Sequence, residues 1–411
     1  MTDHTSQTMT RPVAPALPST LIRTLPLLHG NYGGILQAFA LQTYLREHGV
    51  HAVTDSAVEY RYTVRTPVGT ALALARGRID ERLSPAMRNT VNRNLVTFVR
   101  DSMQTVDDLV ATGPSRRTVL GNISVAIAGS DQVWRAGYGD VRRFLFSDLG
   151  DPAVRKISFA ASFGRDDLQE YSPRLMAESA RLARRFSALS VREDSGVDLC
   201  REHWSVPAER HLDPVFLLEA SRYRELAGRG SSSSDGGQQR EGSLFAYVLD
   251  GSADKTALLE RIAARLGLRL RSLAVPAHGS RRGVRADPDA HVRPSMEDWI
   301  GSISDADFVV TDSFHGAAMS ILLNTPHIAL VNQERGAARF MSLHRTFGLE
   351  DRLVPTVDGS VPAAVAAPVD FDRVNRVVAD ERLRSWQYLT DHVPAMSSAP
   401  GTPVPRPEGS R

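Results

Sequence analysis

The chain is nearly without cysteine and lysine. Its 411 residues include one cysteine, Cys200, and two lysines, so that nearly all of its 49 basic residues are arginines. A single cysteine excludes an internal disulfide and any multi-cysteine metal site, and it is typical of a reducing compartment. Cys200 follows SGVDL in an expected helix, where a buried inert thiol is favoured over a nucleophile. The net charge of +2 gives no indication of a nucleic-acid partner.

Long apolar runs are absent as well. No run reaches the roughly 18 apolar residues of a membrane-spanning helix, and the first 20 residues lack the basic start and apolar core of a signal peptide. Hydrophobic residues make up 42% of the chain and charged residues 23%, both within the range of folded globular proteins. We therefore expect a cytoplasmic protein.

Shifts in composition predict two domains with tails, as the length of the chain also favours. The internal segment from Ser231 to Ser243 is rich in Ser, Gly and Gln and reads as a linker. The basic stretch at 61–118 is expected to be mostly helical. Contact with an anionic membrane surface is one interpretation of its charge, and a solvated helical face is the favoured one. The predicted division is a disordered tail at 1–20, a first domain at 21–230 with a helical insertion at about 61–118, the linker at 231–243, a second domain with a final helix at 244–392, and a disordered tail at 393–411.

Both expected domains alternate apolar strands with helical segments. This alternation predicts an α/β fold with two parallel sheets, one in each domain. Ligands of such sheets bind beyond the carboxyl ends of the strands, so the cleft between the domains is the expected site. The predicted strands are 25–28, 51–54, 123–128, 156–161, 188–192, 244–249, 268–275, 308–310 and 327–331.

The stretch DADFVVTDSFHGAAMSILL, at 305–323, is the most informative about function. Its apolar strand breaks into a polar turn and continues as a helix of small residues. Ser313 is a good N-cap, and Gly316 lets the helix pack close to a sheet. The unpaired N–H groups of the helix start would hold an anion beside His315, a residue type that exchanges protons near neutrality.

Three more loops are expected at strand carboxyl ends. The turn HGNYGG contains Asn31, Gly33 and Gly34; it lacks the GxGxxG spacing, so Asp55 is only a weak candidate for a ribose-binding acid of a nicotinamide site. A tight turn that presents helix N–H groups to a ligand is favoured instead. The other two loops are the GSDQVW turn and the pair Arg192 and Glu193.

The GSDQVW turn leaves two interpretations open. Ser130 or Asp131 would cap a helix, or Asp131 would accept a proton or bind a hydroxyl. Trp134 would be either a core residue or a platform for a sugar ring. No spacing typical of metal ligands appears, and no metal is expected.

Six segments in this order resemble the polysaccharide pyruvyl transferase family, over about residues 25–354. The segments are GNYGGILQAFALQTYL, AGSDQVW, SFAASFG, LSVREDSGVDLC, HLDPVFLL and VVTDSFHGAAMSILL, followed by Arg335 and Arg339. The resemblance implies two Rossmann-like domains in a GT-B-like arrangement with the site in the interdomain cleft. It also implies phosphoenolpyruvate as donor, a sugar, glycan or lipid-linked glycan as acceptor, a pyruvate ketal as product, and no cofactor.

Carried onto matching positions, the resemblance places His315 of FHG and Arg192 of SVRE against the donor. His315 is the expected catalytic acid, with Asp131 or Glu193 as the base. The family pattern RLHG has an arginine where this chain has Ser313. A nucleotide-sugar glycosyltransferase and a non-catalytic binding protein of the same fold remain alternatives. The expected substrate-binding residues are Arg192, Ser313, Gly316, Asn31, Gly33, Gly34, Ser130, Trp134, Arg335 and Arg339.

Overall fold

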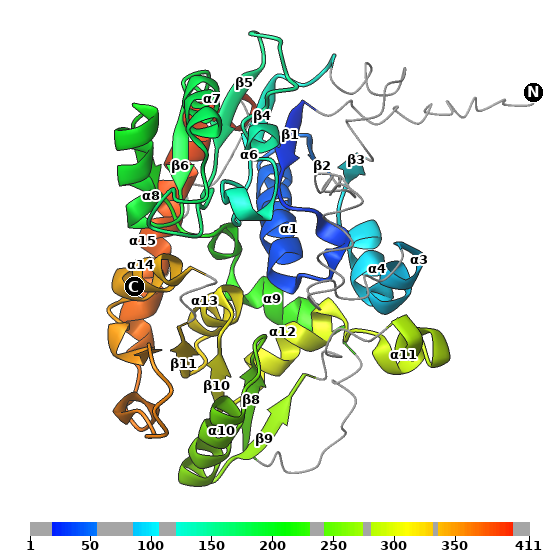
Figure 1. Ribbon diagram of the computed structural model, residues 1–411, viewed down its shortest axis with the longest axis vertical. Coiled ribbons are helices and arrows are strands. Elements are labelled where there is room, and N and C mark those ends of the chain that lie inside the picture. Colours follow the sequence, from blue (N-terminus) through cyan, green and yellow to red (C-terminus); the bar gives the residue numbers. More distant parts are fainter. Residues whose placement is uncertain are drawn as a thin grey trace, which may run out of the picture.

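The computed structural model describes residues 19–55, 85–106, 121–230, 242–273, 281–331 and 336–397 (Figure 1). Most of the expected tails, Arg335, much of the 61–118 stretch and the linker up to residue 241 lie outside these ranges. Within them, no helix is both long enough and apolar enough to cross a membrane.

The first parallel sheet has the strand order β3-β2-β1-β4-β5 and occupies the upper half of Figure 1. A two-stranded parallel sheet, β6-β7, continues it through isolated bridges that join Ile157 to Ala188 and Ala161 to Val191. The chain therefore follows the order 3-2-1-4-5-6 of a Rossmann-type sheet. Its strands are β1 (Thr20–Arg23), β2 (Ala52–Asp55), β3 (Thr105–Val106), β4 (Val125–Ala128), β5 (Arg155–Ser158), β6 (Leu189–Val191) and β7 (Ala208–Arg210).

The second parallel sheet has the order β12-β11-β10-β8-β9 and fills the lower half of Figure 1. Its central strands are short apolar runs buried along their whole length, as parallel strands covered on both faces require. Its strands are β8 (Ser243–Tyr247), β9 (Arg269–Ser272), β10 (Phe308–Thr311), β11 (His327–Leu330) and β12 (Leu353–Val354). Two parallel sheets confirm the predicted α/β class with two Rossmann-like units in a GT-B-like arrangement.

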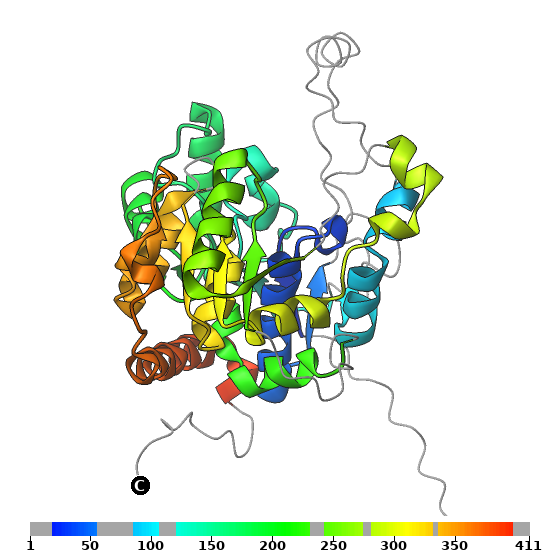
Figure 2. The same cartoon turned by 90° about the horizontal axis from the view of Figure 1, so that it is seen from below.

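Helices cover both sheets. The helix α11 lies beside α3, away from the two sheets (Figure 2). The longer helices are α1 (Tyr32–Glu47), α3 (Pro85–Val91), α4 (Arg93–Ser102), α7 (Pro173–Ala183), α8 (Asp194–Leu199), α9 (Ala220–Ala227), α10 (Ala253–Leu266), α11 (Arg281–Ala286), α12 (Met296–Ser304), α13 (Phe314–Leu322), α14 (Ala337–Phe347) and α15 (Phe371–His392). Short turns of helix are α6 (Val141–Phe144), α16 (Pro394–Ser397), η1 (Leu27–His29), η2 (Ala136–Tyr138), η3 (Cys200–Trp204), η4 (Pro214–Leu217), η6 (Asp289–His291), η7 (Glu350–Arg352) and η8 (Ala363–Val365).

Two helices pack across the division expected from sequence. The helix α9, expected in the first domain, packs against α12 of the second sheet's unit. The long helix α15 runs back to the first unit, where the Tyr388 hydroxyl donates to the Ser158 carbonyl at 2.9 Å and Arg382 Nε donates to the Phe216 carbonyl at 3.0 Å. The chain thus crosses twice between the units.

The first strand lies earlier than predicted. The expected strand at 25–28 is wrong, because β1 ends at Arg23 and η1 begins at Leu27. Pro26, which lacks an N–H for a parallel ladder, separates the two. Three short strands were not predicted from sequence: β7, β12 and β3, the last of which lies in the stretch expected to be helical and pairs with β2. Cys200 is buried as predicted, and burial raises the pKa of its thiol.

Candidate functional site

The site lies where the order of each sheet reverses. In the first sheet this point is between β1 and β4, whose carboxyl ends lead to the HGNYGG and GSDQVW turns. In the second sheet it is between β8 and β10, and β10 leads to Ser313 and His315. Ligands of doubly wound sheets bind at such points. The loops of the two units meet there, since a Cβ placed on Gly33 would lie 2.1 Å from the His315 ring.

The start of α1 is tied to the GSDQVW turn. Asn31 is the N-cap, and its side-chain oxygen accepts from the Gly34 backbone N–H at 3.1 Å. Its amide nitrogen donates to Oδ2 of Asp131 at 3.3 Å. Asp131 adopts a positive φ of 71° and accepts from the Gln132 N–H at 2.9 Å. The structure therefore brings together Asn31, Gly33, Gly34 and Asp131, as the placement of both turns at strand ends predicts.

The centre of the site is Asp213, at the N-cap of η4 in the segment HLDPVFLL. Its Oδ2 accepts from Nη1 of Arg192 at 2.6 Å and from the Ser130 hydroxyl at 2.9 Å. Nε2 of His315 lies 3.4 Å from the same oxygen. That contact is long and poorly aligned, and Nε2 of His315 has no hydrogen-bond partner within the described residues. It becomes an ion pair when the imidazole is protonated.

The surroundings of Asp213 favour its charged form. Burial alone would raise the pKa of this carboxyl, but the His315 imidazole and the Arg192 guanidinium hold it below the ordinary range of aspartate. Asp213 is a residue of the site that was not predicted from sequence, although it lies in the segment HLDPVFLL. The signal was the Asp-Pro pair, an N-cap followed by proline at a first helical position, just after a strand.

Arg192 is held among acidic groups and an aromatic ring. Its Nη2 lies 3.4 Å from Oδ1 of Asp131, and its guanidinium carbon lies 4.2 Å from the centroid of the Phe314 ring. Burial lowers the pKa of this guanidinium, yet Asp213 and Asp131 together raise it above its usual value. Arg192 is therefore charged, and its charge is already balanced by two carboxylates of its own unit.

Arg339 reaches the site from the second unit. It lies on α14, is 5% exposed, and its guanidinium carbon lies 5.5 Å from the Phe314 ring centroid. Burial and the like charge of Arg192 lower its pKa to about 10. Both guanidinium groups therefore lie against the Phe314 ring. The same ring lies edge-on to the His315 imidazole, with the two centroids 5.3 Å apart.

Glu193, one of the two expected bases, accepts hydrogen bonds from a loop of the first unit. Its Oε1 accepts from the Ser162 hydroxyl at 3.0 Å, from the Phe163 N–H at 2.7 Å and from the Gly164 N–H at 3.2 Å. Burial raises the pKa of its carboxyl, against the opposing effect of Arg192. These bonds hold the 162–164 loop, and Glu193 makes none to His315.

Trp134 resolves as a core residue, which corrects its place among the substrate-binding residues. The side chain is 0% exposed, with Trp204 and Phe163 at centroid distances of 5.0 and 5.3 Å. Asp55 is not a ribose ligand either, because its Oδ2 accepts from Nε of buried Arg23 at 2.9 Å. Both side chains stabilise the first unit.

The helix start beside His315 has the predicted cap. The Ser313 hydroxyl accepts from the Gly316 N–H at 3.4 Å, and a Cβ on Gly316 would lie 2.4 Å from the Thr311 hydroxyl oxygen, which explains the glycine. Asp312 faces away from this cap: it accepts from the Leu249 and Asp250 N–H groups at 2.6 and 3.1 Å and pairs with Lys255 at 2.8 Å.

Among solved structures, the chain is similar in outline to several enzymes. UDP-GlcNAc 2-epimerase from Neisseria meningitidis matches at 10% identity and a TM-score of 0.46, covering 94% of this chain and 95% of that one. The N-terminal domain of Candida albicans trehalose-6-phosphate phosphatase matches at 10% identity and a TM-score of 0.48, covering 94% and 98%. ADP-heptose heptosyltransferase II of E. coli matches at 11% identity and a TM-score of 0.35, covering 88% and 99%. No curated protein matches the sequence.

The family comparison is more specific. The family model described as polysaccharide pyruvyl transferase matches residues 31–334, a stretch that runs from Asn31 at the start of α1 past His315. It contains Asp131, Arg192 and Asp213 as well. The chain therefore belongs to the polysaccharide pyruvyl transferase family, and it is a transferase.

Proposed function

We propose that the protein transfers the pyruvyl group of phosphoenolpyruvate to two hydroxyls of a sugar in a glycan or glycoconjugate, forming a pyruvate ketal. The observation that carries this proposal is the contact of His315, from the second unit, with Asp213, from the first, at 3.4 Å. It pairs a proton donor with a carboxylate at the start of a helix. The other loops of both units converge on the same place.

The reaction needs an acid at carbon and an acceptor for hydroxyl protons. Proton transfer to the methylene carbon of phosphoenolpyruvate leaves a cation-like C2, to which the first sugar hydroxyl adds. The second hydroxyl then displaces phosphate from C2 and closes the ketal. The base accepts the proton of the first hydroxyl and passes it back to the acid, and the proton of the second hydroxyl leaves with inorganic phosphate. Atoms and charges balance without a cofactor.

His315 is the proposed acid, and Asp213 positions its imidazole and stabilises the protonated form. Asp131 is the proposed base, since its carboxylate lies beside the α1 turn, where its Oδ2 accepts a long hydrogen bond from the Asn31 amide at 3.3 Å. Helix N–H groups at the start of α13 and the cap at Ser313 share the negative charge of the donor.

Arg339 is the proposed replacement for the arginine of the RLHG pattern, whose place Ser313 takes. Arg192 comes from the first unit, where it pairs with Asp213 and Asp131. Arg339 comes from the second unit and lies against the Phe314 ring. A guanidinium binds carboxylate and phosphate oxygens bidentately, which suits either end of the donor. Asn31, Gly33, Gly34 and Ser130 line the acceptor side.

The test is a phosphate-release assay with phosphoenolpyruvate across a panel of glycan acceptors, with mass spectrometry of the product. We expect phosphate release only with an acceptor, together with the mass of one added pyruvyl ketal. Ligand-induced stabilisation separates the alternatives, since a ligand at about 100 times its Kd adds roughly 2.7 kcal/mol to the free energy of unfolding. Stabilisation by nucleotide sugars and not by phosphoenolpyruvate would instead identify a glycosyltransferase. On this proposal the reaction takes place in the cytoplasm, including the inner face of the membrane.

A further inference from the structure

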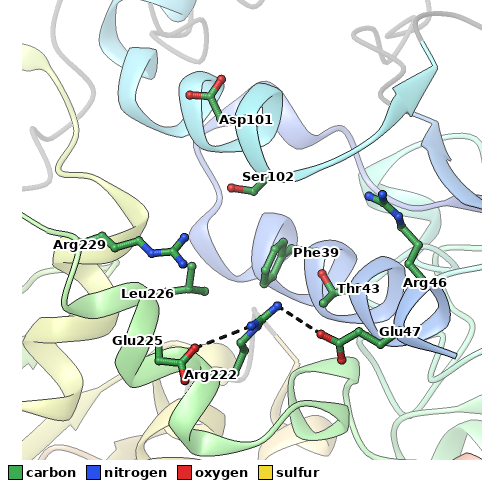
Figure 3. A pocket seen from close by; sticks show the side chains of 10 residues that line it. All are labelled: Phe39, Thr43, Arg46, Glu47, Asp101, Ser102, Arg222, Glu225, Leu226 and Arg229. Atoms are coloured by element: carbon green, nitrogen blue, oxygen red, sulfur yellow. Dashed lines mark hydrogen bonds and ion pairs between the residues drawn. The ribbon is translucent and has the colours of Figure 1, made fainter. Parts of the chain in front are cut away.

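A pocket lies at the far end of α1 from the site. Its volume is about 440 Å³, within the range of about 300–1,000 Å³ of small-ligand sites (Figure 3). Residues of α1, α4 and α9 line it, including Phe39, Thr43, Ser102, Arg222 and Leu226. Thr43 is ten residues beyond Gly33, so about 15 Å of helix separates the pocket from His315.

The pocket combines balanced charge with an apolar floor. Three arginines and three carboxylates line it, so a strongly charged ligand is not favoured. Arg222, at its centre, donates to Oε1 of Glu47 at 3.2 Å and lies 3.7 Å from Oε2 of Glu225 (Figure 3). The Phe39 ring and Leu226 form the floor, both nearly buried. Arg46 and Arg229 have no side-chain partner within the described residues.

This composition fits a neutral ligand with many hydroxyls. A hydroxyl both donates and accepts, so it can bind guanidinium donors and carboxylate acceptors in the same pocket. Thr43 and Ser102 add two hydroxyls of their own. The C–H face of a sugar ring matches the apolar floor at Phe39 and Leu226. A bound anion would have to compete with Glu47 and Glu225 for Arg222.

We propose that this pocket is a second carbohydrate-binding site, which holds one stretch of a glycan chain while another stretch occupies the site at His315. The proposal rests on the proposed function, because it requires a glycan acceptor. A polymer held at both ends of α1 gains affinity through effective concentration without any new contact at the reacting sugar. A short acceptor gains nothing from the pocket.

The first experiment measures binding of the full chain to an array of immobilised neutral oligosaccharides and polysaccharides. Arg222→Ala removes the central donor, and Ser102→Trp fills the pocket. Arg174→Ala, at an exposed position of α7, is the matched control. We expect binding to weaken about tenfold in both pocket variants, as expected for a lost charged hydrogen bond, and to be unchanged in Arg174→Ala. Binding that falls only in His315→Ala, or no binding to any glycan, would overturn the proposal.

The second experiment compares a polymeric with a short acceptor of the same sugar in the pyruvyl-transfer assay. Arg222→Ala should raise KM for the polymer about tenfold. It should leave kcat for the polymer, and both kcat and KM for the short acceptor, unchanged. An equal KM for the polymer in wild type and variant would overturn the second site alone. No transfer to any acceptor, with glycan binding that still depends on the pocket, would refute the proposed reaction and leave the binding site standing.

Discussion

The two units bury their titratable groups in different ways. At the carboxyl edge of its sheet, the first unit buries ion pairs: Arg23 with Asp55 at 2.9 Å, and Arg192 with Asp213 at 2.6 Å. The second unit instead buries two imidazoles against each other, those of His327 and His344, whose Nε2 atoms lie 3.1 Å apart. The buried imidazole of the first unit, His211, lies against the Ser385 hydroxyl at 3.2 Å. Its ion pair between Lys255 and Asp312 keeps the ammonium partly exposed, at 17%.

The ionisable groups of the site come from both units. A buried charge persists only where a partner of opposite charge compensates it, and the first unit supplies such partners within itself. The second unit brings His315 and Arg339 to the boundary without a carboxylate of its own beside His315 among the described residues. The ionised site is therefore completed only where the two units meet. Variants on each side of that boundary test this division of roles.

The largest expected effect is that of His315→Ala on turnover. General acid or base help is typically worth about 10² to 10⁴ in rate, so we expect kcat to fall by that order while the fold stays intact. The measurement is phosphate release from phosphoenolpyruvate, with circular dichroism as the check on folding. His203→Ala, at an exposed position, is the matched control. Near-normal turnover by a folded His315→Ala protein would refute the assignment.

Asp213→Ala should be the most destabilising change in the first unit. It removes the closer of the two carboxylates that pair with buried Arg192 and leaves Asp131 at 3.4 Å, and breaking a buried pair costs about 3–5 kcal/mol. Denaturant unfolding measures it. The double variant Arg192→Leu/Asp213→Leu removes both charges and should lose less stability than the sum of the single variants. Additive losses would show that the pair is not coupled.

The acid sensitivity of the second unit should depend on its buried imidazoles. Burial lowers the pKa of His344 to about 4, and burial together with the neighbouring His344 lowers the pKa of His327 well below its usual value. An unfolded histidine titrates near 6.5, so as the pH falls the unfolded chain takes up protons that the folded chain does not. This contribution to stability is complete above about pH 6.5 and is lost as the pH falls towards 4.

For His344 that loss is on the order of 3 kcal/mol. His344→Gln should therefore flatten the fall in unfolding free energy between pH 6.5 and 4, measured by denaturant titration at each pH. The ion pairs of the first unit contribute equally to both proteins, so the difference between the two curves reports on the pair of imidazoles at His327 and His344. If unfolding free energy fell with pH equally in wild type and His344→Gln, the buried imidazoles would not cause the acid sensitivity.

The architecture could be predicted further from the sequence than the site. The strands β4, β10 and β11 are continuous apolar runs, and such runs identify buried parallel strands without knowledge of tertiary contacts. The strand β1 ends in Arg23, a charge whose partner Asp55 lies on another strand, so its apolar pattern is too short to recognise.

The candidate loops could be predicted because strand carboxyl ends follow from the alternation of elements. The roles within them could not. Asp213 takes part in the site through Arg192 and His315, which are distant in sequence, and Glu193 accepts hydrogen bonds from the 162–164 loop. Whether a carboxylate is a base or a structural acceptor depends on which N–H groups reach it, and that is a property of the folded chain.

The contact between the units can be tested at Gly33. A Cβ there would lie 2.1 Å from the His315 ring, so Gly33→Ala must displace the imidazole or separate the turns. Overpacking of this kind costs about 1–3 kcal/mol. We expect lower unfolding free energy together with lower turnover. The control is Gly150→Ala, where no atom lies within 4 Å of the added methyl. Unchanged turnover in Gly33→Ala would show that the imidazole position is not critical.

The smallest expected effect belongs to an exposed ion pair across the same boundary. Arg345 of α14 lies 3.3 Å from Asp194 of α8, with side-chain exposures of 61% and 44%. Exposed pairs contribute about 0–1 kcal/mol, so Arg345→Ala should change stability little although it joins the two units. Arg201→Ala removes a comparable exposed pair with Asp198 inside the first unit, at 2.6 Å, and is the matched control in the same denaturant titration. A loss of unfolding free energy well above 1 kcal/mol from Arg345→Ala alone would mean that exposed ion pairs such as Arg345 with Asp194 hold the units together. The expected result assigns that role to the buried contacts at Gly33 and Asp213.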